Sequence, residues 1–160
     1  HQTDILLVDD RKENLLTLEA ALASPRYRLF KASSGDEALR YLLDHEPALI
    51  LMDVQMPGLD GYETANLIKN SHRTREIPII FVTALNLDEH YVHRAYDHGA
   101  VDYVYKPFDV HILRSKVSVF VDLAEKSRRL VSAEVALREA EAKERERKIA
   151  QLELTSMRHE

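Results

Sequence analysis

The sequence contains no cysteine in its 160 residues. Without cysteine there is no disulfide framework, no thiolate metal site and no cysteine nucleophile, and a reducing compartment is expected. Long apolar runs are also missing: the longest, residues 48–52 and 77–82, fall far short of the ~20 residues that span a bilayer. Together these absences predict a cytoplasmic protein without a membrane span, a signal peptide or a membrane partner.

Glycine and proline are scarce and unevenly placed. All four glycines and all five prolines lie at or before Pro107, and the 53 residues that follow contain neither. A turn-containing region of about a hundred residues followed by an uninterrupted segment predicts one ordinary domain with an appendage. We expect a domain over residues 1–122 and a helical extension over residues 123–160 that leads to an output domain outside this sequence.

A strongly basic face is also lacking. The net charge is −5; residues 1–108 carry 17 acidic and 11 basic side chains, and residues 109–160 carry 10 and 11. Proteins that bind nucleic acids usually present an excess of lysine and arginine to the phosphate backbone. No direct nucleic-acid partner is expected.

Short apolar runs alternate with stretches of helical periodicity in the first part of the chain. The runs cover residues 5–8, 28–32, 49–52, 79–82 and 101–105. Between them apolar residues recur at helical spacing, for example at Val92, Ala95 and Tyr96. Strands that are apolar throughout are typical of a parallel sheet covered on both faces. Five such strands separated by four helices predict a doubly wound five-stranded parallel α/β fold.

Polar residues that could bind a ligand or take part in a reaction follow these expected strands. They are Asp9-Asp10 after the first strand, Asp53 after the third, Thr83-Ala84 after the fourth and Lys106-Pro107 after the fifth. Ligands of such sheets bind beyond the carboxyl ends of the strands. Clustered carboxylates repel one another and have raised pKa values unless a cation neutralises them, and Mg²⁺ is the natural partner of such oxygen ligands. The pattern indicates an acidic site built to accept a phosphoryl group.

Four motifs around these positions resemble the receiver domain of two-component response regulators. They are Val8-Asp9-Asp10, the run Met-Asp-Val-Gln-Met-Pro-Gly-Leu-Asp-Gly at 52–61, Val82-Thr83-Ala84, and Tyr-Val-Tyr-Lys-Pro-Phe at 103–108. Each motif is common alone, but their order and spacing match the family over about residues 4–120. The resemblance implies a flavodoxin-like receiver.

The resemblance also implies a role for each acidic residue. Asp53 would be the phosphoacceptor, phosphorylated from a phosphohistidine of a sensor histidine kinase or a phosphotransfer protein. Asp10, Asp53 and the backbone carbonyl of Gln55 would hold Mg²⁺, and Asp9 would contribute through a water molecule. The chain would then catalyse only its own phosphorylation and dephosphorylation, and would not otherwise be an enzyme.

The remaining motif positions would bind the phosphoryl group and report its presence. Lys106 would pair with the carboxylate and then with the phosphate, and the Lys106-Pro107 peptide would be cis. Thr83, followed by Ala84, would hydrogen-bond a phosphoryl oxygen. Tyr103 would be the aromatic switch residue, whose ring moves inward on phosphorylation.

Other interpretations of these residues remain open. His90 and His93 lie three residues apart on an expected helix and could bind a metal, although a solvated helix surface is the simpler interpretation. A phosphohydrolase of the haloacid dehalogenase type also uses an aspartyl phosphate, but that family needs an acid where this chain has Gln55. A constitutive dimerisation scaffold is a further alternative, disfavoured by the intact aspartate, threonine and lysine set.

The segment after the expected domain has a heptad pattern. Leu123, Leu130 and Leu137 recur every seven residues, and charged residues fill much of the remaining surface. Such a repeat predicts a continuous helix that forms a two-stranded coiled coil and a homodimer. A single solvated helix is the alternative. The sequence does not distinguish between the expected outputs, which include a diguanylate cyclase, a phosphatase and a kinase core.

Overall fold

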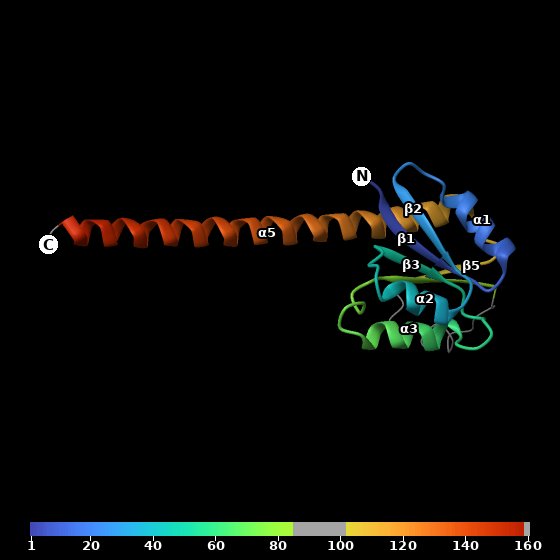
Figure 1. Cartoon of the computed structure of the whole chain (residues 1–160). Helices are drawn as coiled ribbons and strands as arrows, with labels where there is room; N and C mark the ends of the chain where they lie inside the picture. The colour runs from blue at the N-terminus through green and yellow to red at the C-terminus, as the bar shows by residue number, and fades with distance from the viewer. Residues whose placement is uncertain (85–101, 159–160) are drawn as a thin grey trace. The chain divides into compact units, whose positions relative to one another are not determined.

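The computed structural model describes residues 1–84 and 102–158. Its elements in chain order are β1 (Thr3–Val8), α1 (Lys12–Leu22), β2 (Tyr27–Ala32), α2 (Gly35–Leu42), β3 (Leu49–Met52), α3 (Gly61–Asn70), β4 (Ile79–Thr83), β5 (Asp102–Tyr105) and α5 (Val110–Arg158) (Figure 1). The five expected strands are confirmed to within two residues at their described ends. The helix expected around Val92, and with it His90 and His93, lies outside the described residues.

All five strands are parallel, in the order β2-β1-β3-β4-β5. This confirms the expected doubly wound sheet. The chain first adds β2 on one side of β1 and then crosses to place β3 on the other, so the strand order reverses between β1 and β3. Doubly wound sheets bind ligands at this switch point, beyond the carboxyl ends of the two strands.

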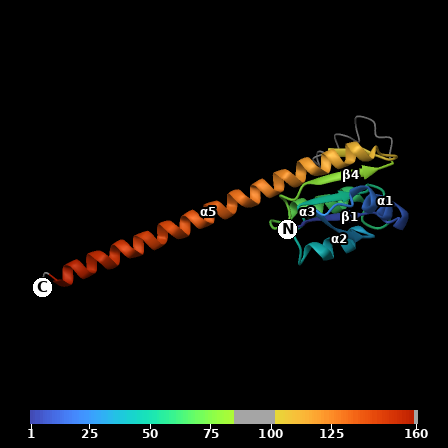
Figure 2. The same ribbon diagram turned by 90° about the horizontal axis from the view of Figure 1, so that it is seen from above.

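Both faces of the sheet are buried, which explains why its central strands are apolar throughout. Leu6 and Val8 of β1 belong to a core shared with α2 and α3, whereas Ile5 and Leu7 belong to a core shared with α1 and α5. The buried residues of α5 are Leu113, Val117 and Val121. Figure 2 shows α2 on one side of the sheet and the first turns of α5 on the other. The start of α5 is thus an integral layer of the domain.

Side chains close the ends of the helices on the α2 and α3 side. The Ser34 hydroxyl accepts a hydrogen bond from the backbone N–H of Glu37 at 3.0 Å, the N-cap expected of a serine before a helix. Asp60 and Glu63 form a reciprocal capping box at the start of α3. The guanidinium of Arg73 donates to the carbonyls of Leu42 and Leu43 at the end of α2, where the last carbonyls of a helix have no partner within it. These contacts close both ends of α2 and the beginning of α3.

Tyr41 of α2 belongs to an aromatic cluster with His45 and with Phe30 of β2. Its ring stacks on His45 with centroids 4.3 Å apart and lies 5.3 Å from the Phe30 ring. In the part of the chain that the structure describes, its hydroxyl oxygen is the buried side-chain polar atom that lacks a hydrogen-bond partner. Burial raises the pKa of Tyr41 to about 12; the charge of Asp4 also raises it, and Arg28 opposes this effect.

Replacing Tyr41 with phenylalanine is expected to raise the free energy of unfolding by about 1 kcal/mol at neutral pH, because a buried hydroxyl without a partner is removed. The wild-type protein should lose stability as the pH rises from 10 to about 12, since the unfolded chain ionises its tyrosine before the folded chain does. The variant should lose less. Urea unfolding at neutral and alkaline pH measures both effects, with Tyr105→Phe as the exposed control; a less stable Tyr41→Phe variant would contradict the prediction.

The chain divides into two compact units, His1–Asp122 and Leu123–Glu160, and helix α5 begins in the first and continues into the second. In the first unit, Arg114 Nε donates to the Ala21 carbonyl at 2.6 Å and Arg26 pairs with Asp122 at 2.7 Å. These bonds and the buried apolar residues hold the first turns of α5 in the domain. No described helix is both long and apolar enough to cross a membrane.

In the second unit, the structure describes residues 123–158, and all of them are helical. Its leucines are exposed; Leu130, for example, has 71% of its surface accessible. Ion pairs within the helix join Glu134 to Arg138 and Glu144 to Arg147. Pairs at this spacing stabilise a helix on their own, while the exposed leucines leave an apolar stripe along it.

Candidate functional site

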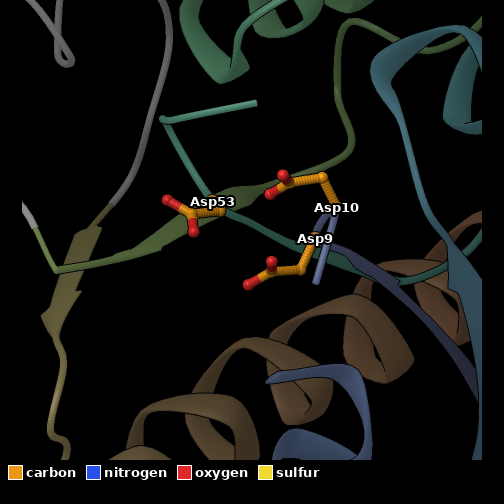
Figure 3. Close-up of side chains that lie close together, drawn as sticks. All are labelled: Asp9, Asp10 and Asp53. Atoms are coloured by element: carbon orange, nitrogen blue, oxygen red, sulfur yellow. The ribbon is translucent and has the colours of Figure 1, made fainter. Parts of the chain in front are cut away.

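Three carboxylates lie together at the switch point of the sheet. Asp9 and Asp10 directly follow β1, and Asp53 directly follows its neighbour β3. Carboxylate oxygens of the three lie within 4.8 Å of one another, and Figure 3 shows the side chains gathered at the strand ends. Asp9 and Asp53 are buried, whereas Asp10 is exposed. The expected acidic site therefore has one side open to solvent.

Lys106 supplies the positive charge of this site. Its Nζ lies 2.7 Å from Asp9 Oδ2 and 3.0 Å from Asp53 Oδ2, and its side chain is 15% exposed. The backbone N–H of Lys106 donates to the Thr83 carbonyl at 2.9 Å, which extends the pairing of β5 with β4 beyond the strand. The peptide bond between Lys106 and Pro107 is cis. One ammonium thus bridges the carboxylates that follow β1 and β3.

The pKa of Lys106 is raised above its ordinary value, although two effects oppose each other. Burial lowers it by disfavouring the charged form, whereas the hydrogen bonds to Asp9 and Asp53, together with the charges of these carboxylates, raise it by more. The lysine is therefore firmly cationic at neutral pH.

Both oxygens of the buried Asp9 carboxylate are already occupied. Oδ1 accepts from the Arg11 backbone N–H at 3.0 Å and from Asn14 Nδ2 at 3.3 Å, while Oδ2 accepts from Lys106. Asn14 lies in the first turn of α1, so the helix itself orients this carboxylate. The interpretation of the sequence missed Asn14; its place one helical turn after the acidic pair was the available signal.

The loop after Asp53 is held close to the acidic residue. The Gln55 backbone N–H donates to Asp53 Oδ1 at 3.1 Å, and the Gly61 N–H donates to the Val54 carbonyl at 2.8 Å. Gly58 has a φ of 74°, in the left-handed region that glycine adopts without strain. A Cβ atom on Gly61 would lie 2.3 Å from the Asp53 carbonyl oxygen, so α3 can begin here only with glycine.

The remaining expected positions lie on β4 and β5. Thr83 is the last residue of β4, is buried, and stands opposite Tyr105 in the strand register. Ala84 follows it and is exposed. Tyr103 lies three residues before Lys106 and is buried, with 7% of its surface accessible. Adjacent strand ends thus place the threonine and the lysine at the same edge as the acidic cluster.

A doubly wound parallel sheet with three carboxylates and a lysine at its switch point is a flavodoxin-like domain with an acidic site. Within that class the family is established by comparison with known proteins. The chain belongs to the response regulator receiver domain family, whose model matches residues 5–118. The resemblance inferred from the four motifs is confirmed.

Curated relatives are similar over the same part of the chain. A probable cyclic di-GMP phosphodiesterase of Vibrio cholerae is 40% identical over 116 residues, which are 72% of this chain and 26% of that protein. The response regulator PleD of Caulobacter vibrioides is 36% identical over 113 residues, 71% of this chain and 25% of PleD. The chain therefore spans about a quarter of the length of these relatives.

Solved structures share the fold. The receiver domain of a signal transduction histidine kinase from Syntrophus aciditrophicus is 33% identical, with a TM-score of 0.69 over 75% of this chain and 90% of that one. The receiver domain of the sensor histidine kinase PA1611 from Pseudomonas aeruginosa is 32% identical, with a TM-score of 0.69 over 76% and 99%. That structure has a magnesium ion coordinated in its active site cleft.

Proposed function

We propose that this chain is a phosphorylation-dependent signalling switch in which Asp53 accepts a phosphoryl group from a histidine kinase or a phosphotransfer protein. The observation that carries the proposal is the position of Lys106, whose ammonium contacts both Asp9 and Asp53 beside a third carboxylate. A lysine so placed can neutralise an acceptor carboxylate and then a phosphate oxygen.

The donor set fits a magnesium ion, because three carboxylates within reach of one another are the hard oxygen ligands that Mg²⁺ prefers. Asp10, Asp53 and the backbone carbonyl of Gln55 would hold it. Asp9 would act through water, since both of its oxygens already accept hydrogen bonds. When bound, the ion supplies positive charge that offsets the charge of the carboxylates and of an incoming phosphoryl group.

The reaction needs little covalent assistance from the protein. A carboxylate oxygen of Asp53 forms a bond to phosphorus while the bond from phosphorus to the donor histidine nitrogen breaks, and the imidazole keeps that electron pair and takes up a proton. Lys106 and the Thr83 hydroxyl would then bind phosphoryl oxygens, beside Ala84. Tyr103 would take its inward position, the buried one in which the structure describes it, when the site carries a phosphoryl group, because a local charge biases a two-state element.

The extension would transmit this state as a homodimer. We assign residues 1–122 to the receiver domain and residues 123–160 to a helical connection towards an output domain. The exposed leucines at seven-residue spacing support a two-stranded coiled coil between two copies. A cytoplasmic location, without a membrane or nucleic-acid partner, fits this role.

Incubation with Mg²⁺ and acetyl phosphate tests the proposal. Intact mass spectrometry should show the addition of one phosphoryl group to the wild-type chain and none to Asp53→Asn, because the amide is not a nucleophile. Asp44→Asn, which changes an exposed acid, should be phosphorylated like the wild type. An unmodified wild type, or a modified Asp53→Asn variant, would refute the switch.

Light scattering of the same samples gives the oligomeric state, and a monomer in every sample would refute the dimer.

A further inference from the structure

Two buried tyrosines from distant parts of the chain meet beside the acidic site. Tyr62 lies in the first turn of α3 and Tyr103 lies on β5, and their hydroxyl oxygens are 3.0 Å apart. Their exposed fractions are 3% and 7%. Phe81 of β4 packs against both rings, with its centroid 5.2 Å from that of Tyr62 and 5.7 Å from that of Tyr103. The aromatic packing and the hydrogen bond together fix both rings.

The Tyr62–Tyr103 hydrogen bond and the Lys106–Asp53 ion pair join the same two chain segments, residues 53–62 and residues 103–106. Tyr62 directly follows Gly61, whose backbone is pressed against the Asp53 carbonyl. Tyr103 precedes Lys106 by three residues on β5 and its extension. The Lys106–Asp53 ion pair at 3.0 Å and the Tyr62–Tyr103 bond at 3.0 Å are therefore two cross-links between one pair of segments.

A phenylalanine at position 62 would supply the same ring and could pack against Phe81 equally well. The hydroxyl adds a directional bond in a buried place, where hydroxyl groups need partners and hydrogen bonds constrain geometry most strongly. The bond thus links α3 to β5 in a way that the burial of apolar surface alone would not.

We propose that Tyr62 is a positioning residue of the acidic site: its hydroxyl holds Tyr103, and with it β5 and Lys106, in the arrangement that receives a phosphoryl group at Asp53. The inference rests on the proposed function and adds to it a residue outside the motifs of the sequence. Tyr62 acts through Tyr103 and does not touch the reacting atoms.

Beryllofluoride, an analogue of the phosphoryl group, tests this positioning role. Its Kd in the presence of Mg²⁺ is measured by calorimetry for the full chain, for Tyr62→Phe, for Tyr103→Phe and for the double variant. Each single change should weaken binding about fivefold, equivalent to the ~1 kcal/mol net value of a buried hydrogen bond. The double variant should be no weaker than either single variant, because the same bond is lost in all three.

Controls separate positioning from general stability. Tyr27→Phe removes a hydroxyl from β2, at the opposite edge of the sheet, and should leave the Kd unchanged. Thermal unfolding without ligand checks that each variant is folded, and a loss of stability without a change in Kd would overturn the inference. Additive effects in the double variant would also overturn it. Failure of the wild type to bind beryllofluoride would instead refute the proposed function, and this inference with it.

Discussion

Replacement of Lys106 with methionine is expected to lower the free energy of unfolding by about 3 kcal/mol in buffer without divalent cations. Methionine keeps most of the apolar stem but removes the cation that contacts Asp9 and Asp53. Asp9 is 1% exposed and would lose its charged partner, and Asp10 adds a further negative charge nearby. Urea unfolding of both proteins measures the loss.

The difference in the free energy of unfolding between the wild type and Lys106→Met should depend on the pH and on the metal concentration. Because the folded protein raises the pKa of Lys106, the stabilisation is complete below the unfolded value of 10.5 and is lost as the pH rises through the folded value. On the alkaline side, the difference in the free energy of unfolding between the wild type and the variant should therefore narrow only above pH 10.5. Mg²⁺ should also narrow it, since a bound cation replaces part of the missing charge.

Lys116→Met is the matched control for this variant. Lys116 pairs with Asp102 at 2.8 Å, but both side chains are about a third exposed, and such pairs contribute less than about 1 kcal/mol. If Lys106→Met and Lys116→Met lowered the free energy of unfolding by the same small amount, the prediction that Lys106 neutralises buried carboxylates would be wrong.

Gly61→Ala should disrupt the fold and the site together. The new methyl group would lie 2.3 Å from the Asp53 carbonyl oxygen and 2.7 Å from the Val54 Cα, and neither backbone atom can move without displacing the acceptor loop. We expect a loss of about 3 kcal/mol in the free energy of unfolding, at the upper end of the usual cost of overpacking. Phosphorylation of the protein that remains folded should also be impaired.

Gly58→Ala provides the comparison within the same loop. Nothing lies within 4 Å of a Cβ at this position, so its cost comes only from the φ of 74°. That cost should be about 1 kcal/mol, the penalty of a left-handed conformation for alanine. Equal losses for the two variants, measured by urea unfolding, would show that close approach to Asp53 is not what requires glycine at position 61.

The strands and the acidic cluster could be predicted because each rests on local sequence. Apolar runs bounded by turn residues gave the strand positions, and parallel strands necessarily bring their carboxyl ends to one edge. Asp9, Asp10 and Asp53 therefore converge for a topological reason that needs no side-chain detail. Lys106 follows from the same rule, as the residue after the last strand.

The contacts of Asn14 and Tyr62 could not be predicted in this way. Asn14 contacts Asp9 across the turn between β1 and α1, five residues away, and Tyr62 contacts Tyr103, 41 positions away. Both depend on how helices pack against the sheet, which periodicity does not specify. Gly61 was visible in the motif as a glycine, but the sequence alone did not give its distance from the Asp53 carbonyl.

The uninterrupted helix α5 has a consequence for how this receiver could be joined to other proteins. Each residue of an α-helix turns the chain by about 100° about the axis, so one inserted residue would redirect every side chain that follows it. Seven inserted residues would restore the direction to within about 20°. Since residues 108–160 contain no glycine or proline to absorb such a change, angular phase matters more than length along this segment. Fusions made after Asp122 should therefore be compared by the rotation about the helix axis that their added residues produce.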